Sequence, residues 1–163
     1  MLLLLADGTR VPVTELPGTG PWTFLVLEPD PSAAAEPLTR FGRAVVPDLR
    51  ARPGWGRPPG SPGFGDLVDD LDQVRTRAGL GRPVLVGVGD LVPAALAAAA
   101  DQPWAWRALL LVPPVDRPVP EADLDQLDLP ALAVADTAAV EGLLGPLGGG
   151  PGWAGIAPDA PPR

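Results

Sequence analysis

Short apolar runs that alternate with helix-like segments constrain this sequence more than any other feature. The apolar runs are bounded by Gly, Pro or Asp, which is typical of strands that are covered on both faces. Segments with apolar residues at helical spacing separate the runs from Trp22 to Leu144. This alternation predicts an α/β fold, with a mostly parallel sheet, right-handed crossovers and helices on both faces. Two apolar runs flank Asp7-Gly8 and predict an antiparallel hairpin that precedes the parallel strands.

The boundaries of the predicted strands and helices follow from the same bounding residues, Gly, Pro and Asp. We predict strands at 2–6, 11–14, 22–27, 44–46, 84–88, 108–112 and 129–135. We predict helices at 32–41, 66–79, 90–100 and 137–144, with Ser32 and Asp90 as N-caps of the first and third. Gly and Pro make residues 50–65 a loop. We interpret residues 1–145 as one domain and residues 146–163 as a poorly ordered, Gly- and Pro-rich C-terminal tail.

Composition removes several function classes. The 163 residues include no Cys and no His, so the chain offers no disulfide, no thiolate metal site and no histidine general base. The net charge of −8 argues against nucleic acid and against an anionic membrane surface. The apolar start, residues 1–5, is too short for a signal sequence or a span, so we expect a soluble cytoplasmic protein. The dominance of Ala, Gly, Pro, Arg, Leu and Val is typical of a GC-rich, bacterial genome.

Three segments together resemble the α/β-hydrolase superfamily. They are GRAVVPDLR at 42–50, LGRPVLVG at 80–87 and QPWAWRALLLV at 102–112. The first is similar to a strand and turn of that family, the second to the strand that leads into the nucleophile elbow, and the third to a helix end and the following strand. Their order and spacing match across residues 2–145, so the resemblance implies a truncated α/β-hydrolase-like fold with only about fifteen residues in place of a cap. The pocket should then be open, or closed by a partner chain.

The catalytic features implied by this resemblance are altered or missing. The elbow of the family reads G-x-S-x-G, and here Gly89 falls on the serine position. Glu28-Pro29 replaces the histidine-glycine pair that helps shape the oxyanion hole, and a carboxylate there would repel an oxyanion. Asp136 falls near the position of the catalytic acid but has no histidine to orient. We therefore expect a degenerate member without esterase activity, which binds a small apolar ligand or a protein partner.

Several side chains are candidates for the ligand pocket at the carboxyl ends of the strands. They are Glu28, Asp30, Arg52, Trp55, Gly89, Asp90 and Asp136. If Glu28, Asp90 and Asp136 converge, they offer weak candidates for a general acid or base, or ligands for a hard cation such as magnesium. The simpler interpretation makes Glu28 and Asp136 solvated loop carboxylates and makes Asp90 a helix cap. We expect neither a metal nor a cofactor, and Gly87-x-Gly89 lacks the third glycine of a dinucleotide site.

Two enzymatic alternatives stay open beside the binding role. One is a non-hydrolytic cyclase or isomerase of bacterial secondary metabolism, in which a pocket carboxylate such as Glu28 or Asp136 moves a proton. The other is an α/β-hydrolase with an unusual Asp90 nucleophile, which requires a slip of one residue along the elbow. A decayed reading frame that folds poorly is a third explanation of the same sequence.

Charge and tryptophan placement suggest two surfaces. A basic stretch, opposed only by Asp48, contains Arg40, Arg43, Arg50, Arg52 and Arg57, whereas residues 108–162 hold eight acids and one arginine, Arg117. This asymmetry is compatible with docking of an acidic partner such as an acyl carrier protein, or of a second copy, although ordinary surface charge in a lysine-free protein is the simpler explanation. Trp104 and Trp106 occupy alternate positions and should share one packed face.

Overall fold

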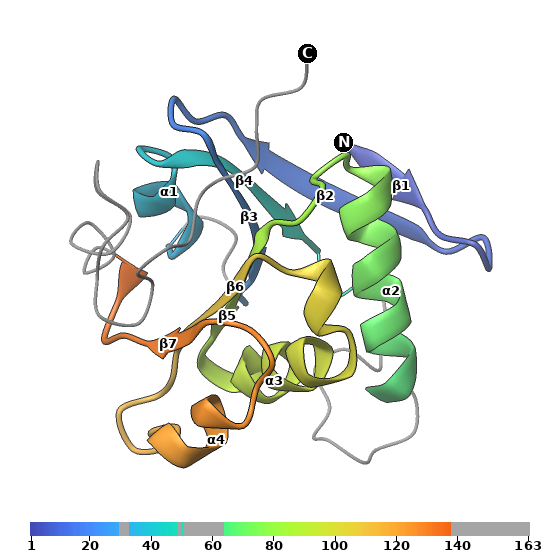
Figure 1. The fold of residues 1–163 in the computed structure, drawn as a ribbon. Helices are drawn as coiled ribbons and strands as arrows, with labels where there is room; N and C mark the ends of the chain where they lie inside the picture. Colours follow the sequence, from blue (N-terminus) through green and yellow to red (C-terminus); the bar gives the residue numbers. More distant parts are fainter. Residues whose placement is uncertain (30–32, 49, 51–63, 138–163) are drawn as a thin grey trace.

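A computed structural model describes residues 1–29, 33–48, 50 and 64–137 (Figure 1). The described strands form a seven-stranded sheet in the order β1-β2-β4-β3-β5-β6-β7. The strands are β1 (Leu2–Leu4), β2 (Arg10–Leu16), β3 (Trp22–Leu27), β4 (Gly42–Pro47), β5 (Val84–Val88), β6 (Ala108–Val112) and β7 (Ala131–Ala133). The β1–β2 and β2–β4 pairs are antiparallel, and the remaining pairs are parallel. The predicted α/β fold with an N-terminal hairpin is therefore confirmed.

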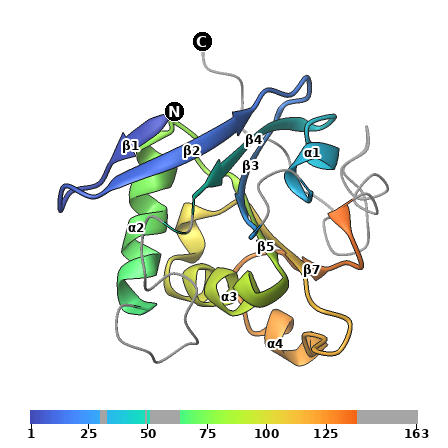
Figure 2. The ribbon, with the colours of Figure 1, turned by 180° about the vertical axis from the view of Figure 1, so that it is seen from behind.

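Helices cover both faces of this sheet, as Figures 1 and 2 show from opposite sides. The helices are α1 (Ala35–Leu38), α2 (Phe64–Arg77), α3 (Val92–Asp101) and α4 (Glu121–Asp125). Alternate residues of β3 divide between two apolar clusters: Leu25 and Leu27 pack with α2 and α3, whereas Phe24 and Val26 pack with α1. This division is the period-two pattern of a strand covered on both sides, which is why its sequence is a continuous apolar run.

Helix α2 forms where the sequence predicts it because its apolar residues repeat on one stripe. Leu67, Leu71 and Val74 are fully buried along that stripe. Arg75 pairs with Asp72 one turn earlier, with 2.6 Å between Nη2 and Oδ1. The helix ends at Arg77, two residues before the predicted end at Gly79, whose φ of +65° lies in the left-handed region that favours glycine.

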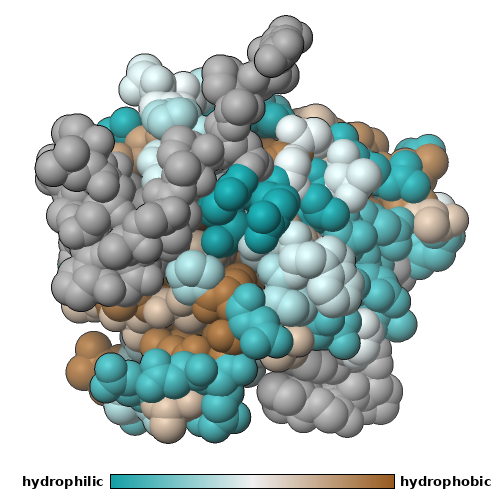
Figure 3. All heavy atoms as spheres, viewed as in Figure 1, coloured by the Kyte–Doolittle hydropathy of each residue, from teal (hydrophilic) through white to brown (hydrophobic). Residues whose placement is uncertain are grey.

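The short connection between β6 and β7 contains a helix that the sequence analysis missed. Helix α4 packs its half-buried Leu124, together with Leu127 and Leu129, against the cluster beneath β7. Figure 3 shows apolar side chains gathered on this side of the molecule, over β7 and beside α4. Strand β7 is correspondingly shorter than the predicted 129–135, and all three of its residues are half-buried.

Two further predictions need correction. Trp104 and Trp106 do not share a face, because residues Pro103–Ala105 form a 3₁₀ turn instead of a strand. Trp106 is completely buried and donates Nε1–H to the carbonyl of Ala98, whereas the Trp104 side chain is 67% exposed. The first helix spans only Ala35–Leu38, and Ser32, its predicted N-cap, lies outside the described residues.

The predicted helix at 137–144 and the tail at 146–163 fall almost wholly outside the described residues. The division into a domain at 1–145 and a tail stays a prediction. Within the part of the chain that is described, no helix has the length and apolar character needed to cross a membrane.

Candidate functional site

A sharp backbone bend joins β5 to the helix behind it, at the position where the sequence analysis places the elbow. Val88 is still extended, with φ −120° and ψ 132°. Gly89 then adopts φ +59°, a left-handed conformation that costs a residue with a side chain about 1 kcal/mol or more. A 3₁₀ turn, Gly89–Leu91, leads directly into α3. The strand, bend and helix of a nucleophile elbow are therefore present, and no side chain stands at its tip.

The two glycines of this bend have different surroundings. A Cβ atom built on Gly89 would meet no atom of the described residues within 4 Å, so these residues leave the tip of the bend uncovered. A Cβ atom built on Gly87 would lie 2.5 Å from Cβ of Ala95. Gly87 is thus required for the close approach of α3 to β5, whereas Gly89 is required by its backbone conformation.

Glu28 is not the solvated loop carboxylate of the simpler interpretation. Its side chain is 3% exposed at the end of β3. Its Oε2 accepts the Ala34 amide at 2.7 Å, and its Oε1 accepts the Ala35 amide at 3.2 Å. Glu28 therefore satisfies two otherwise unpaired N–H groups at the start of α1, the role that was assigned to Ser32. Sequence analysis missed this because the carboxylate reaches across six residues from a preceding strand.

Asp90 does not cap the helix, since neither the 3₁₀ turn nor α3 has a side-chain cap bond at its start. Its Oδ1 instead accepts Nη2 of Arg117 at 2.5 Å, in the connection after β6. Hydrogen bonding to the Asp90 carboxylate raises the pKa of the Arg117 guanidinium. Both side chains are largely exposed, 79% for Asp90 and 62% for Arg117, so water screens the attraction between them.

The remaining candidates are not assembled into one cluster by the described residues. Asp136 lies in an exposed position after β7. Asp30, Arg52 and Trp55 lie outside the described residues. Across 1–29, 33–48, 50 and 64–137, no three acidic side chains come together in a way that could hold a metal ion. The magnesium arrangement of Glu28, Asp90 and Asp136 is therefore wrong, and the assignment of the seven candidates to ligand binding stays a prediction.

A row of half-buried valines lies beside the bend and was missed by the sequence analysis. Val88 ends β5 and is paired in register with Val112, which ends β6. Val134 follows β7 and donates its amide to the carbonyl of Leu111, which extends the row across the next strand. All three side chains are half-buried at the carboxyl edge of the sheet. Part of the signal was available in the sequence, because two predicted strands end on Val88 and Val112, and Val134 is the last residue but one of the predicted strand at 129–135.

The predicted basic stretch is partly neutralised. Arg43 pairs with Glu15 of β2 at 2.8 Å, an acid that is remote in sequence. Arg50 makes two bonds to the Asp48 carboxylate, and these hydrogen bonds lower the pKa of Asp48. Arg40 lies over the Phe41 ring at 5.9 Å. Arg52 and Arg57 lie outside the described residues, and docking of an acidic partner stays a prediction.

Comparison with known proteins identifies the fold. No family model matches the sequence, and no curated protein matches it. Among solved structures, a hydrolase from Pseudomonas aeruginosa PA01 is 19% identical, with a TM-score of 0.53 over 77% of this chain and 50% of that one. The deformylase Nfo from Pseudomonas putida S16 is 24% identical, with a TM-score of 0.52 over 71% of this chain and 47% of that one.

A third solved structure, the N-acyl homoserine lactonase AidH in complex with N-butanoyl homoserine, is 18% identical. Its TM-score is 0.50 over 77% of this chain and 48% of that chain. This chain thus spans about half the length of the three proteins, at identities that establish shared architecture and not shared activity. Sheet order, elbow geometry and these likenesses together show that the chain has an α/β-hydrolase-like fold.

Proposed function

We propose that this chain is a degenerate α/β-hydrolase-like protein that binds a small apolar ligand beside the elbow and does not hydrolyse esters. The observation that carries the proposal is Gly89, which keeps the positive φ of the bend and presents no side chain at its tip. A nucleophilic mechanism requires an oxygen or sulfur atom at that point, with a base to activate it. The sequence supplies no histidine for the second role.

The surroundings of Glu28 support the absence of hydrolysis. By resemblance, an oxyanion hole would be built around residues 28 and 29. Glu28 instead places a carboxylate there, whose oxygens already occupy the Ala34 and Ala35 amides. Pro29 offers no backbone N–H group. A site with a fixed negative charge and no spare donor from this segment disfavours a second developing negative charge.

The valine row supports an apolar ligand. Val88, Val112 and Val134 form an apolar strip at the carboxyl edge, where ligands of open α/β sheets bind. Each side chain retains some exposed surface, so a ligand that covers the strip would remove apolar area from water. The enzymatic alternatives have less support, because Glu28 is engaged with the start of α1 and Asp90 with Arg117.

The first experiment tests for hydrolytic chemistry. The purified protein is incubated with a fluorophosphonate probe and, separately, with short-chain nitrophenyl esters. We expect no covalent label and no ester turnover above that of a Gly89→Ala variant. Labelling of the protein, or turnover that this substitution lowers, would overturn the proposal.

The second experiment tests the apolar site with Nile red, a neutral fluorophore whose emission rises in apolar surroundings. We expect saturable binding that a Val112→Ser substitution weakens by roughly tenfold, in keeping with about 1.5 kcal/mol for a valine side chain. Val115→Ser is the matched control, because Val115 lies in the same connection and is fully exposed. Equal binding by both variants, or no saturable binding by the natural chain, would contradict an apolar site at the valine row.

A further inference from the structure

Strand β1 lies at one end of the sheet and exposes an unusual concentration of apolar side chains. Five large apolar side chains stand out as exposed among the described residues, and three of them fall within four consecutive positions. These are Met1 at 53%, Leu2 at 57% and Leu4 at 53%. An exposed apolar edge strand is ordinarily protected by a charge or a proline, since it can pair with another chain. Residues 1–6 contain no charged side chain and no proline, and the charged α-amino group of Met1 is bonded to the carbonyl of Val13.

The backbone N–H and C=O groups of β1 that do not bond to β2 point away from the sheet at Leu2 and Leu4, the same positions whose side chains are exposed. Met1 exchanges both backbone bonds with Val13, at 2.9 and 2.8 Å, and Leu5 donates to Thr9 at 2.8 Å. Leu2 lies opposite Pro12, which has no N–H group to offer. Because an antiparallel ladder alternates, the N–H and C=O groups of Leu2 and Leu4 face away from β2. In the described part of the chain no strand lies beyond them.

We propose that β1 is a dimerisation edge, on which the β1 strand of a second copy pairs antiparallel about a two-fold axis at Leu3. In this register Leu2 of each copy lies opposite Leu4 of the other, and the outward groups of the two residues exchange four hydrogen bonds. Leu2 and Leu4 share one face of the strand, so the two copies form a four-leucine cluster there. The edge is complementary to itself, which favours a second copy over an unrelated partner.

Charge placement also permits a second copy despite the net charge of −8. The acidic hollow lined by Asp7, Asp66, Asp69 and Asp70 lies past the far end of β1. In the proposed register the two Asp7 residues are eight strand positions apart, or roughly 27 Å, beyond the ~8 Å screening length of physiological salt. The acidic groups of the two copies therefore lie at opposite ends of the shared ladder.

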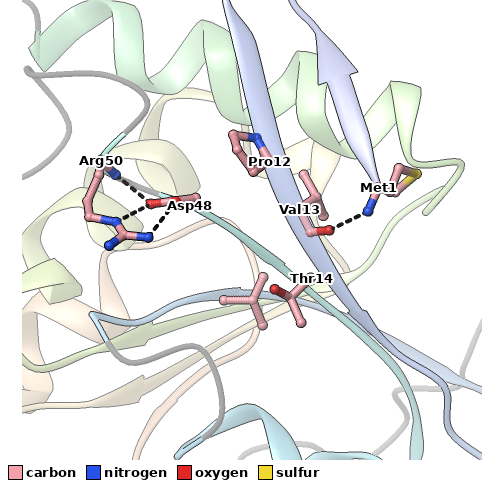
Figure 4. Close-up of a pocket in the computed structure, with 7 residues that line it drawn as sticks. Met1, Pro12, Val13, Thr14, Asp48 and Arg50 are labelled. Carbon is pink, nitrogen blue, oxygen red and sulfur yellow. Dashed lines mark hydrogen bonds and ion pairs between the residues drawn. The ribbon is translucent and has the colours of Figure 1, made fainter.

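The surface beside the other end of β1 carries balanced charge. A hollow of about 220 Å³ is lined there by Met1, Pro12, Thr14 and the Asp48–Arg50 pair (Figure 4). Arg50 points its guanidinium at both oxygens of Asp48, at 2.9 and 2.8 Å. The charges of Asp48 and Arg50 in this hollow are thus paired with each other.

The test is the mass of the full chain by sedimentation velocity across a wide concentration range. We expect a reversible rise from 16.7 kDa toward twice that value. Leu2→Lys combined with Leu4→Lys should weaken association by more than about tenfold, because it places charges in the leucine cluster. Val115→Lys, at a more exposed apolar residue outside β1, should leave association unchanged. A constant mass of 16.7 kDa, or a dimer that survives the double substitution, overturns the proposal.

The register is tested by cross-linking. The natural sequence has no cysteine, so each introduced cysteine is the only thiol of its chain. A Leu2→Cys chain mixed with a Leu4→Cys chain should form a disulfide-linked dimer under mild oxidation, since the two positions lie opposite each other. Leu2→Cys mixed with Val115→Cys is the control and should stay unlinked. Equal linkage in both mixtures would show that the cross-link reports collision and would refute the register.

Discussion

Single carboxylates in this protein take structural roles that their sequence neighbours do not reveal. Glu28 and Asp90 both follow strands and look alike in sequence. Glu28 is buried and holds two amides of α1, whereas Asp90 is exposed and pairs with Arg117. The difference comes from what lies opposite each residue, a helix start for one and a loop arginine for the other. A carboxylate at a strand end is thus as suited to building the scaffold as to chemistry.

The structural role of Glu28 predicts a large loss of stability on truncation. Glu28→Ala leaves the buried Ala34 and Ala35 amides without their acceptors, which should cost about 2–4 kcal/mol of the free energy of unfolding. Glu36→Ala is the matched control, because Glu36 is exposed on the same short helix and should change stability by less than about 0.5 kcal/mol. Urea denaturation measures both. Equal effects of the two substitutions would show that the contacts of Glu28 contribute nothing.

Helices and strands could be predicted where their own sequence marks both of their ends. Strands β3 and β5 have the predicted bounds, since an uninterrupted apolar run can be satisfied only by burial on both faces. Helix α4 was missed because its first turn is acidic and its anchoring leucines become apolar contacts only once β7 is in place. Helix α1 was predicted too long because its capping group comes from β3. Those errors arise from tertiary contacts, which a local pattern does not contain.

The elbow yields a prediction at the level of the β5–α3 unit. Gly87→Ala places its Cβ 2.5 Å from Cβ of Ala95, between strand and helix, and should cost about 2–3 kcal/mol, the upper part of the range for overpacked cores. Gly89→Ala meets no atom of the described part of the chain within 4 Å and should cost only the ~1 kcal/mol of its left-handed backbone. Chemical denaturation of the two variants ranks them. A greater loss for Gly89→Ala would mean that helix and strand are not in close contact at Gly87.

At the scale of the whole molecule, half the length of the related structures is enough to build both faces of the sheet. The two apolar clusters lie on opposite faces but draw on the same four strands, β3, β4, β5 and β6. Residues of the two clusters alternate along each of these strands. Loss of the helices from one face would therefore expose strands that also form the core of the other face. The domain is therefore expected to unfold as one unit, which distinguishes it from a decayed reading frame.

Cooperative unfolding is tested with one substitution on each face. Leu71→Ala removes a fully buried side chain from the α2 side, and Leu38→Ala removes one from the α1 side. Each should cost about 2–5 kcal/mol and shift the tryptophan fluorescence and far-ultraviolet circular dichroism transitions together. Because the chain has five tryptophans, each face is read in a chain that keeps one of them and has Phe at the other four positions: Trp106 reports the α3 cluster and Trp22 the α1 cluster. If Leu38→Ala released the Trp22 signal while the Trp106 signal and the helix content persisted, the faces would be separate folding units.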